Sequence, residues 1–285
     1  MAINIHFFRN SALDKLDFSK VLEFFDNLPL FKTFYTEDEV QIEYRDDDFK
    51  FSYRYLITKK SRVNQIYKLN PVFLNVNFLL ELPVLIPSFL AKEILTVAQK
   101  ICKTFDLEIY NDAFKDVQPF NLADVVVLFE ESRRLTIEEY GMQDKLVFDK
   151  EKLDEICRYQ RSVESLREYY HNEVDVFVCE PIMDKITNEY GISCTWRVGK
   201  PTVFPPHLRY VYVTDENDAP FLVHRDDFFE HMSKYLMEIV NFLPDMYILK
   251  AKPAKKARKV VNKLRKLAIL DQNFKPVRLS NLLDV

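Results

Sequence analysis

The sequence predicts an α+β protein with largely antiparallel sheets, helices packed on one face, and two α/β units joined by a helical middle segment. Short runs alternate between apolar and polar residues, which is typical of half-buried strands. Longer runs repeat apolar residues every three or four positions, which is typical of amphipathic helices. Hydrophobic residues make up 48% of the 285 positions, enough for the core of one large domain or two ordinary ones.

The first third of the chain switches repeatedly between the two patterns. The predicted elements are a strand at 3–7, a helix at 17–28 ended by Pro29, a hairpin of 40–44 and 49–57 around the acidic turn 46–48, a strand at 72–82, a helix at 88–105 and a strand at 107–110. In the strand at 72–82 we expect one buried face, formed by Val72, Leu74, Val76, Phe78, Leu80 and Leu82.

The middle of the chain, from about 116 to 172, is predicted to be mostly helical. Its second helix has Asp149 as a plausible N-cap. The segment could be an insertion between two units or a lid over one of them. The second half then predicts strands at 174–178, 192–198, 208–214 and 221–223, a helix at 227–243 and a last strand at 246–249.

This pattern divides the chain into four segments. They are an N-terminal α+β unit at 1–112, a helical insertion or linker at 113–172, a C-terminal α+β unit at 173–249, and a basic amphipathic helix with a C-terminal tail at 250–285. Because the predicted core elements end near Leu249, we expect residues 1–249 to fold without the remainder.

The glycine count excludes several common sites. The chain has only Gly141, Gly191 and Gly199, whereas a phosphate-binding loop or a dinucleotide-binding turn needs clustered glycines. The nucleophile elbow Gly-x-Ser-x-Gly is also absent. Four separated cysteines form no Cys-x-x-Cys pair. We therefore predict no cofactor, and an enzyme is the less favoured class.

The location is predicted from three further features. The first residues lack the apolar run of a secretory signal, and the longest apolar stretch, 78–91, is too short to span a bilayer and is interrupted by charge and proline. Cys194 alternates with Ile192, Trp196 and Val198 and is predicted to be an inert thiol on the apolar face of a strand. These features predict a cytoplasmic protein without a transmembrane segment.

Two small sets of residues could carry chemistry. His224, Asp227 and His231 have side chains that suit zinc or iron, but their spacing matches no established ligand pattern, so we predict a polar helix start and no metal. Trp196 and His207 could line a binding pocket beside the stiff loop 200–206, which contains three prolines. An ordinary strand connection is the alternative.

The most unusual segment is 250–266, here called the basic segment, with nine Lys and Arg and no acid. The rest of the chain has 31 basic and 44 acidic residues, a net charge of −13 compared with −4 for the whole. Apolar positions form a stripe along it, so it is predicted to be a basic amphipathic helix. The candidate binding residues are Lys255, Lys256, Arg258, Lys259, Lys263, Arg265 and Lys266.

These observations favour a non-catalytic protein that binds another macromolecule, first of all a protein, as an adaptor, inhibitor or immunity-type partner. One alternative is a nucleic-acid-associated protein that uses the basic segment. A second is a metal-dependent enzyme centred on His224, Asp227 and His231. The basic segment could also pack against the acidic body of its own chain, and a homo-oligomer is left open.

Overall fold

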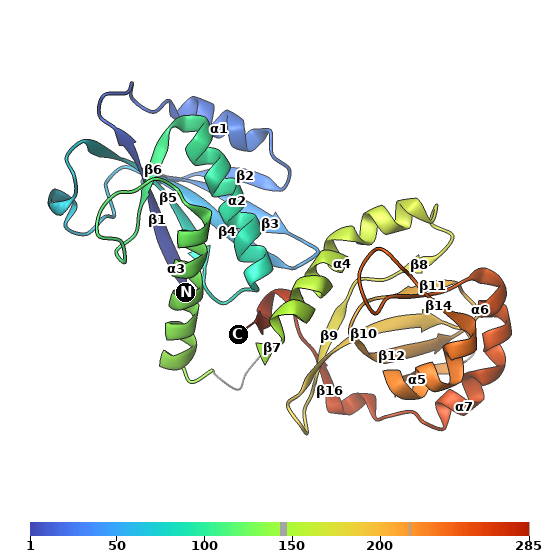
Figure 1. Ribbon diagram of the computed structural model, residues 1–285. Helices are drawn as coiled ribbons and strands as arrows, with labels where there is room; N and C mark the ends of the chain where they lie inside the picture. The colour runs from blue at the N-terminus through green and yellow to red at the C-terminus, as the bar shows by residue number, and fades with distance from the viewer. Residues whose placement is uncertain (143–146, 217, 285) are drawn as a thin grey trace. The chain divides into compact units, whose positions relative to one another are not determined.

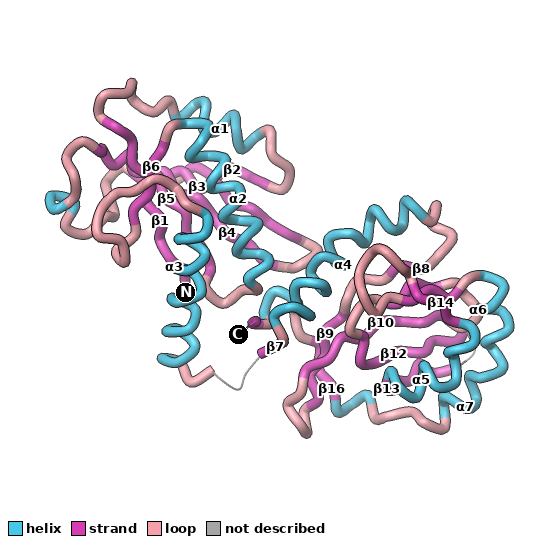
Figure 2. The backbone as a smooth tube through the Cα atoms, viewed as in Figure 1, coloured by secondary structure: helices cyan, strands magenta, loops and turns pink. Residues whose placement is uncertain are grey.

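The computed structural model describes residues 1–142, 147–216 and 218–284. The fold is α+β with sheets that are mainly antiparallel, as the sequence predicts. The chain forms two compact units, Met1–Lys145 (unit 1) and Leu146–Val285 (unit 2), and each has its own strands and helices (Figures 1 and 2). The four predicted segments are a finer division, and their boundaries stay a prediction.

Unit 1 is built on a six-stranded sheet in the order β2-β3-β4-β5-β1-β6, in which every neighbouring pair is antiparallel. Phe25 of α1 contacts the rings of Tyr55 and Phe78, and Phe24 contacts Phe105 of α2, so both helices lie on one face of the sheet. The elements are β1 (Ala2–Asn10), α1 (Phe18–Asp26), β2 (Phe31–Tyr35), β3 (Glu39–Asp46), β4 (Phe51–Thr58), a 3-10 turn (Ile66–Lys68), β5 (Phe73–Pro83), α2 (Ser88–Phe105), β6 (Leu107–Tyr110) and α3 (Leu122–Glu139).

Helix α2 and strand β6 have the predicted bounds. Asp106 adopts φ 49° at the end of α2, a left-handed conformation that ends the helix and lets the chain return at once as a strand. Helix α1 is also confirmed, and Asp17 caps it by accepting a hydrogen bond from the Ser19 backbone N–H at 3.0 Å.

The predicted single buried face of 72–82 is wrong in its first half. Phe78, Leu80 and Leu82 are buried, but Val72 is 46% exposed and Leu74 56% exposed. The pairing of β1 with β5 shifts at Phe7 and Phe8, and Asn77 on the opposite strand has φ 55°. Val76 and Asn77 are extra residues at this β-bulge, so Leu74 pairs with Arg9 near the end of β1, where its side chain stays exposed.

Unit 2 contains a five-stranded sheet, β13-β12-β10-β9-β16, and a four-stranded sheet, β14-β15-β11-β8. Most neighbours are antiparallel, but β10 runs parallel to β12, and β8 to β11. The elements are β7 (Val147–Phe148), α4 (Lys150–Tyr169), β8 (Asp175–Val176), β9 (Glu180–Asp184), β10 (Tyr190–Arg197), β11 (Thr202–Phe204), β12 (Leu208–Asp215), β13 (Asp218–His224), α5 (Arg225–Met232), β14 (Leu236–Glu238), β15 (Tyr247–Leu249), α6 (Ala251–Ala257), α7 (Val261–Arg265), β16 (Phe274–Pro276) and β17 (Leu283–Asp284), with 3-10 turns at Ser233–Tyr235, Arg258–Val260, Asp271–Asn273 and Leu279–Asn281.

Helix α4 begins where the sequence predicts. The Asp149 side chain accepts a hydrogen bond from the Lys152 backbone N–H at 3.0 Å, as an N-cap does. The Tyr159 hydroxyl donates to the Phe177 backbone carbonyl at 2.9 Å, which holds α4 to the segment that follows β8. The helical middle segment of the prediction is thus represented by α3 in unit 1 and α4 in unit 2.

The predicted helix at 227–243 is wrong in its second half. Helix α5 ends at Met232, and the chain continues through a 3-10 turn into β14, which pairs antiparallel with β15. Asn241 and Asp245 both have positive φ, 68° and 56°, and so allow the chain to turn between the two strands. Pairing with β15 therefore overrides a helical spacing of apolar residues.

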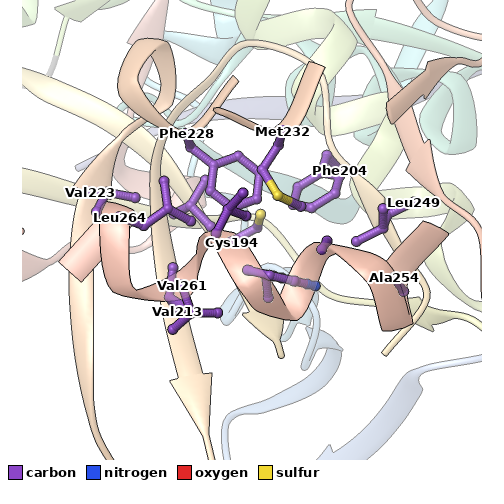
Figure 3. Packing of buried hydrophobic residues seen from close by; sticks show 14 of the residues in the cluster. Cys194, Phe204, Val213, Val223, Phe228, Met232, Leu249, Ala254, Val261 and Leu264 are labelled. Carbon is purple, nitrogen blue, oxygen red and sulfur yellow. The ribbon is translucent and has the colours of Figure 1, made fainter. Parts of the chain in front are cut away.

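The core of unit 2 extends beyond Leu249, so the expectation that the core elements end there was wrong. Figure 3 shows Ala254, Val261 and Leu264 of the basic segment packed with Cys194 and Phe228. Strand β16 also adds an edge to the five-stranded sheet through its pairing with β9. The buried cluster consists of Cys194, Trp196, Phe204, Leu208, Val211, Val213, Phe221, Val223, Phe228, Met232, Leu249, Ala254, Ala257, Val260, Val261 and Leu264.

Candidate functional site

The basic segment is helical through α6, a 3-10 turn and α7. At the two joints the backbone stays right-handed, with φ/ψ of −70°/−16° at Ala257 and −91°/−10° at Val260. Five of its apolar side chains are buried in the core of unit 2, which holds the segment against that core. These side chains are Ala254, Ala257, Val260, Val261 and Leu264.

The opposite side of the segment carries six exposed lysines, here called the lysine face: Lys252, Lys255, Lys256, Lys259, Lys263 and Lys266. In an unbroken α-helix these positions would lie within an arc of roughly 100°, and the 3-10 turn at Arg258–Val260 widens that arc. The buried positions occupy the other side of the same helical path. The sequence therefore separates the segment into an apolar side that packs and a cationic side that faces solvent.

The lysine face forms no ion pair with the carboxylates of the chain, as far as residues 1–142, 147–216 and 218–284 are described. Arg265 differs from these lysines, since its guanidinium lies 2.9 Å from the Asp218 carboxylate and 4.6 Å from the centre of the Phe221 ring. Of the seven basic residues predicted to bind a partner, Arg265 alone is half-buried, and the other six are exposed.

Arg258 has a contact that the sequence analysis missed. Gly199 has φ 82°, and a Cβ atom at this position would lie 2.3 Å from Nε of Arg258 and 2.8 Å from its Nη2. Only a glycine lets the guanidinium lie so close to this turn. Lys200 follows directly and is exposed, so the turn after β10 adds a second charge beside Arg258. Because the chain has only three glycines, Gly199 could have been recognised from the sequence as a position where a side chain does not fit.

The structure places Trp196 in the core and away from any binding surface. Its side chain is fully buried, and its ring packs edge-on against Phe228 with 5.6 Å between ring centres. Cys194 is buried in the same cluster, so its predicted position on the apolar face of a strand is confirmed. Burial also raises the pKa of the Cys194 thiol, which makes it unreactive at neutral pH.

His207 lies in a polar cluster separate from Trp196. Its Nε2 is 2.5 Å from a carboxylate oxygen of Glu155 on α4, and its backbone N–H donates to the Asp245 carboxylate at 3.3 Å. Asp245 also pairs with Arg225, at the start of α5. These contacts connect α4, the turn before β12, and the β14–β15 turn. They hold the side chain of His207, which is 18% exposed, inside unit 2.

The three residues of the metal hypothesis do not converge. Within the described ranges, no three His, Cys, Asp or Glu side chains lie close enough together to hold a metal ion. The His224 ring instead lies 5.3 Å from the Tyr210 ring across the β12–β13 pair. Asp227 lies in the first turn of α5, where a carboxylate is favoured by the helix dipole.

Unit 1 has two shallow hollows near the end of α2, of about 580 Å³ and 420 Å³. The larger is lined by both charge signs, including Arg9, Lys20, Asp17 and Glu23. The smaller is lined in part by Cys102, and burial raises the pKa of that thiol far above neutral. Neither hollow combines a reactive group with a charge arrangement that would activate it.

In the described chain, no helix is both long enough and apolar enough to cross a bilayer. Searches against protein-family models, curated proteins and solved structures found no match to this chain.

Proposed function

We propose that this chain is a non-catalytic binding protein that holds an acidic macromolecule on the lysine face of unit 2. The observation that carries this proposal is the two-sided construction of the basic segment. Its apolar side is part of the core, and its six lysines face solvent without a carboxylate partner in the described chain. Such a surface is fixed in place before a partner arrives, which lowers the entropy cost of binding.

The charge distribution supports a partner outside the chain. Unit 2 has 22 Lys and Arg and 21 Asp and Glu, so its net charge is near zero although nine of its positive charges lie in 17 residues. The acidic side chains of the unit could have neutralised the lysine face. Among residues 147–216 and 218–284, however, Arg265 alone in the basic segment forms an ion pair, with Asp218. A concentrated surface charge of this kind attracts oppositely charged partners over several ångströms and speeds their association.

Capture from a cell extract tests the proposal. The intact protein would be compared with a variant in which Lys255, Lys256, Lys259 and Lys263 are replaced by Glu. A control variant with four exposed lysines of unit 1 replaced by Glu has the same net charge; the four positions are Lys20, Lys60, Lys68 and Lys92.

We expect the intact protein and the control to capture the same acidic partner at low salt, and the lysine-face variant to lose it. Nuclease treatment of the extract then distinguishes a protein partner, which survives, from a nucleic acid, which does not. Capture of the same partners by all three proteins would contradict the proposal.

A further inference from the structure

We infer that the partner of the lysine face is duplex nucleic acid, bound through its phosphates without reading the base sequence. This inference rests on the proposed function and names the partner class for the same surface. Three properties of the surface lead to it: its side-chain chemistry, its length, and the position of Arg258 beside Gly199.

The side-chain chemistry disfavours a protein partner. The centres of protein–protein interfaces are rich in aromatic residues and depleted in lysine. In the basic segment, every large apolar side chain is turned into the core, and no aromatic residue is present. The basic segment therefore offers a protein partner charged side chains but no large apolar or aromatic side chain to bury. Phosphates, in contrast, are bound by lysine as a point charge and need no apolar contact.

A membrane surface also presents phosphates, but the same burial disfavours it. Amphipathic helices bind membranes by placing their apolar side among the acyl chains, with the basic side near the headgroups. Here the apolar side of the segment is already occupied by the core cluster around Leu264 and Trp196. The lysine face could therefore meet headgroups by charge alone, without the apolar insertion that makes such binding stable.

The length of the surface suits a duplex. Lys252 and Lys266 are 14 residues apart along α6, the 3-10 turn and α7, which sets an upper limit of about 22 Å on their separation along the segment. A duplex carries one negative charge per about 1.7 Å of its axis, so roughly twelve phosphate charges lie along that length. Single strands are bound largely by stacking of bases on aromatic side chains. The segment has none, so a duplex is the favoured form.

Arg258 adds a guanidinium group to the lysine face. Its guanidinium lies against Gly199, where no side chain can displace it, and Lys200 is next in the turn. A guanidinium can bind one phosphate through two parallel hydrogen bonds, which an ammonium group cannot do. Arg265 provides a natural contrast, because Asp218 already occupies its guanidinium.

Fluorescence anisotropy with labelled duplexes of about 20 base pairs tests the inference, using the full chain. If all six lysines contact phosphates, the slope of log affinity against log salt is about −5, and affinity falls about a thousandfold between 50 and 200 mM salt. Two unrelated duplex sequences should give the same curve. Replacing Lys255 and Lys259 by Gln should make the slope less steep by about 2, whereas Lys20→Gln with Lys60→Gln in unit 1 should leave it unchanged.

The two arginines give a matched pair of variants. Arg258→Lys keeps the charge but loses the planar fork, and we expect it to lower duplex affinity severalfold, whereas Arg265→Lys should not. Absence of duplex binding at 50 mM salt by a folded protein, judged by its Trp196 fluorescence, would overturn the inference. If the lysine face then captures a nuclease-resistant protein, the proposed function survives and only the named partner is wrong. Binding of phosphatidylserine vesicles without any macromolecular partner would contradict both.

Discussion

Replacement of Leu264 by alanine is the sharpest test of the claim that the basic segment belongs to the core of unit 2. The side chain of Leu264 is fully buried in the cluster that contains Trp196 and Phe228. Removal of a buried leucine side chain costs 2–5 kcal/mol, because apolar contacts are lost and a cavity remains. With about 3 kcal/mol lost and a urea dependence of about 2 kcal/mol per molar, the unfolding midpoint should fall by about 1.5 M.

The chain provides its own probe for this measurement. Trp196 is the single tryptophan, it has no exposed surface, and it belongs to the same cluster as Leu264. Its fluorescence in urea therefore reports the unfolding of unit 2 separately from that of unit 1. Lys263→Ala is the matched control, since it changes the neighbouring residue on the exposed side and should leave the midpoint unchanged.

The reasoning would be refuted if Leu264→Ala unfolded at the same urea concentration as the unaltered protein, with the same dependence of its unfolding free energy on urea. That result would mean that the apolar stripe is not held in the core, and that the lysine face is not fixed in place. A weaker urea dependence together with a lower midpoint would instead indicate a change in the cooperativity of unfolding. Calorimetry of thermal unfolding would resolve this case.

Three further predictions follow from buried groups and from the glycines. Burial raises the pKa of the thiols of Cys102, Cys179 and Cys194, and Cys157 is buried as well. A thiol reagent at pH 8 should therefore modify none of the four rapidly until denaturant exposes them. Burial lowers the pKa of His6 below its unfolded value of about 6.5, so the unfolded state binds the proton more tightly. Stability should thus fall as the pH drops below 6.5, and His6→Gln should reduce that fall in urea midpoints measured from pH 7.5 to 5; an unchanged pH dependence would contradict this. Gly199→Ala should destabilise unit 2 by more than Gly141→Ala destabilises unit 1, because both have positive φ but only Gly199 has a close neighbour; equal losses in thermal unfolding would show that Arg258 yields without cost.

Much of the fold follows from local patterns because local signals agreed with tertiary contacts. In α2, the apolar spacing, the preceding proline and the end at Asp106 all favour the same bounds. Prediction failed where a long-range contact decided the outcome. A bulge at Asn77 cannot be seen in an alternating sequence, and the pairing of β14 with β15 depends on two residues that adopt positive φ. Short strands such as β2 and β9 were missed because each is five residues long and has no clear alternation of its own.

The candidate surface was predictable in outline but not in its detail. A stripe of apolar residues between lysines identifies both sides of the basic segment from sequence alone. No sequence pattern pairs Arg265 with Asp218, which lies 47 residues away, or places Arg258 on Gly199. Trp196 alternates with Cys194 along β10, and this pattern already predicts that Trp196 is buried and not part of a binding surface.

The basic segment also shows how folding and binding oppose each other at one surface. The lysine face contains like-charged pairs three and four residues apart, such as Lys255 and Lys259, and such pairs destabilise a helix. Burial of the apolar side in the core of unit 2 offsets this repulsion. A polyanion on the lysine face would remove the repulsion, and any ligand that binds only the folded state stabilises it by mass action. The repulsion on the lysine face is therefore a cost for folding alone that binding of a polyanion would relieve.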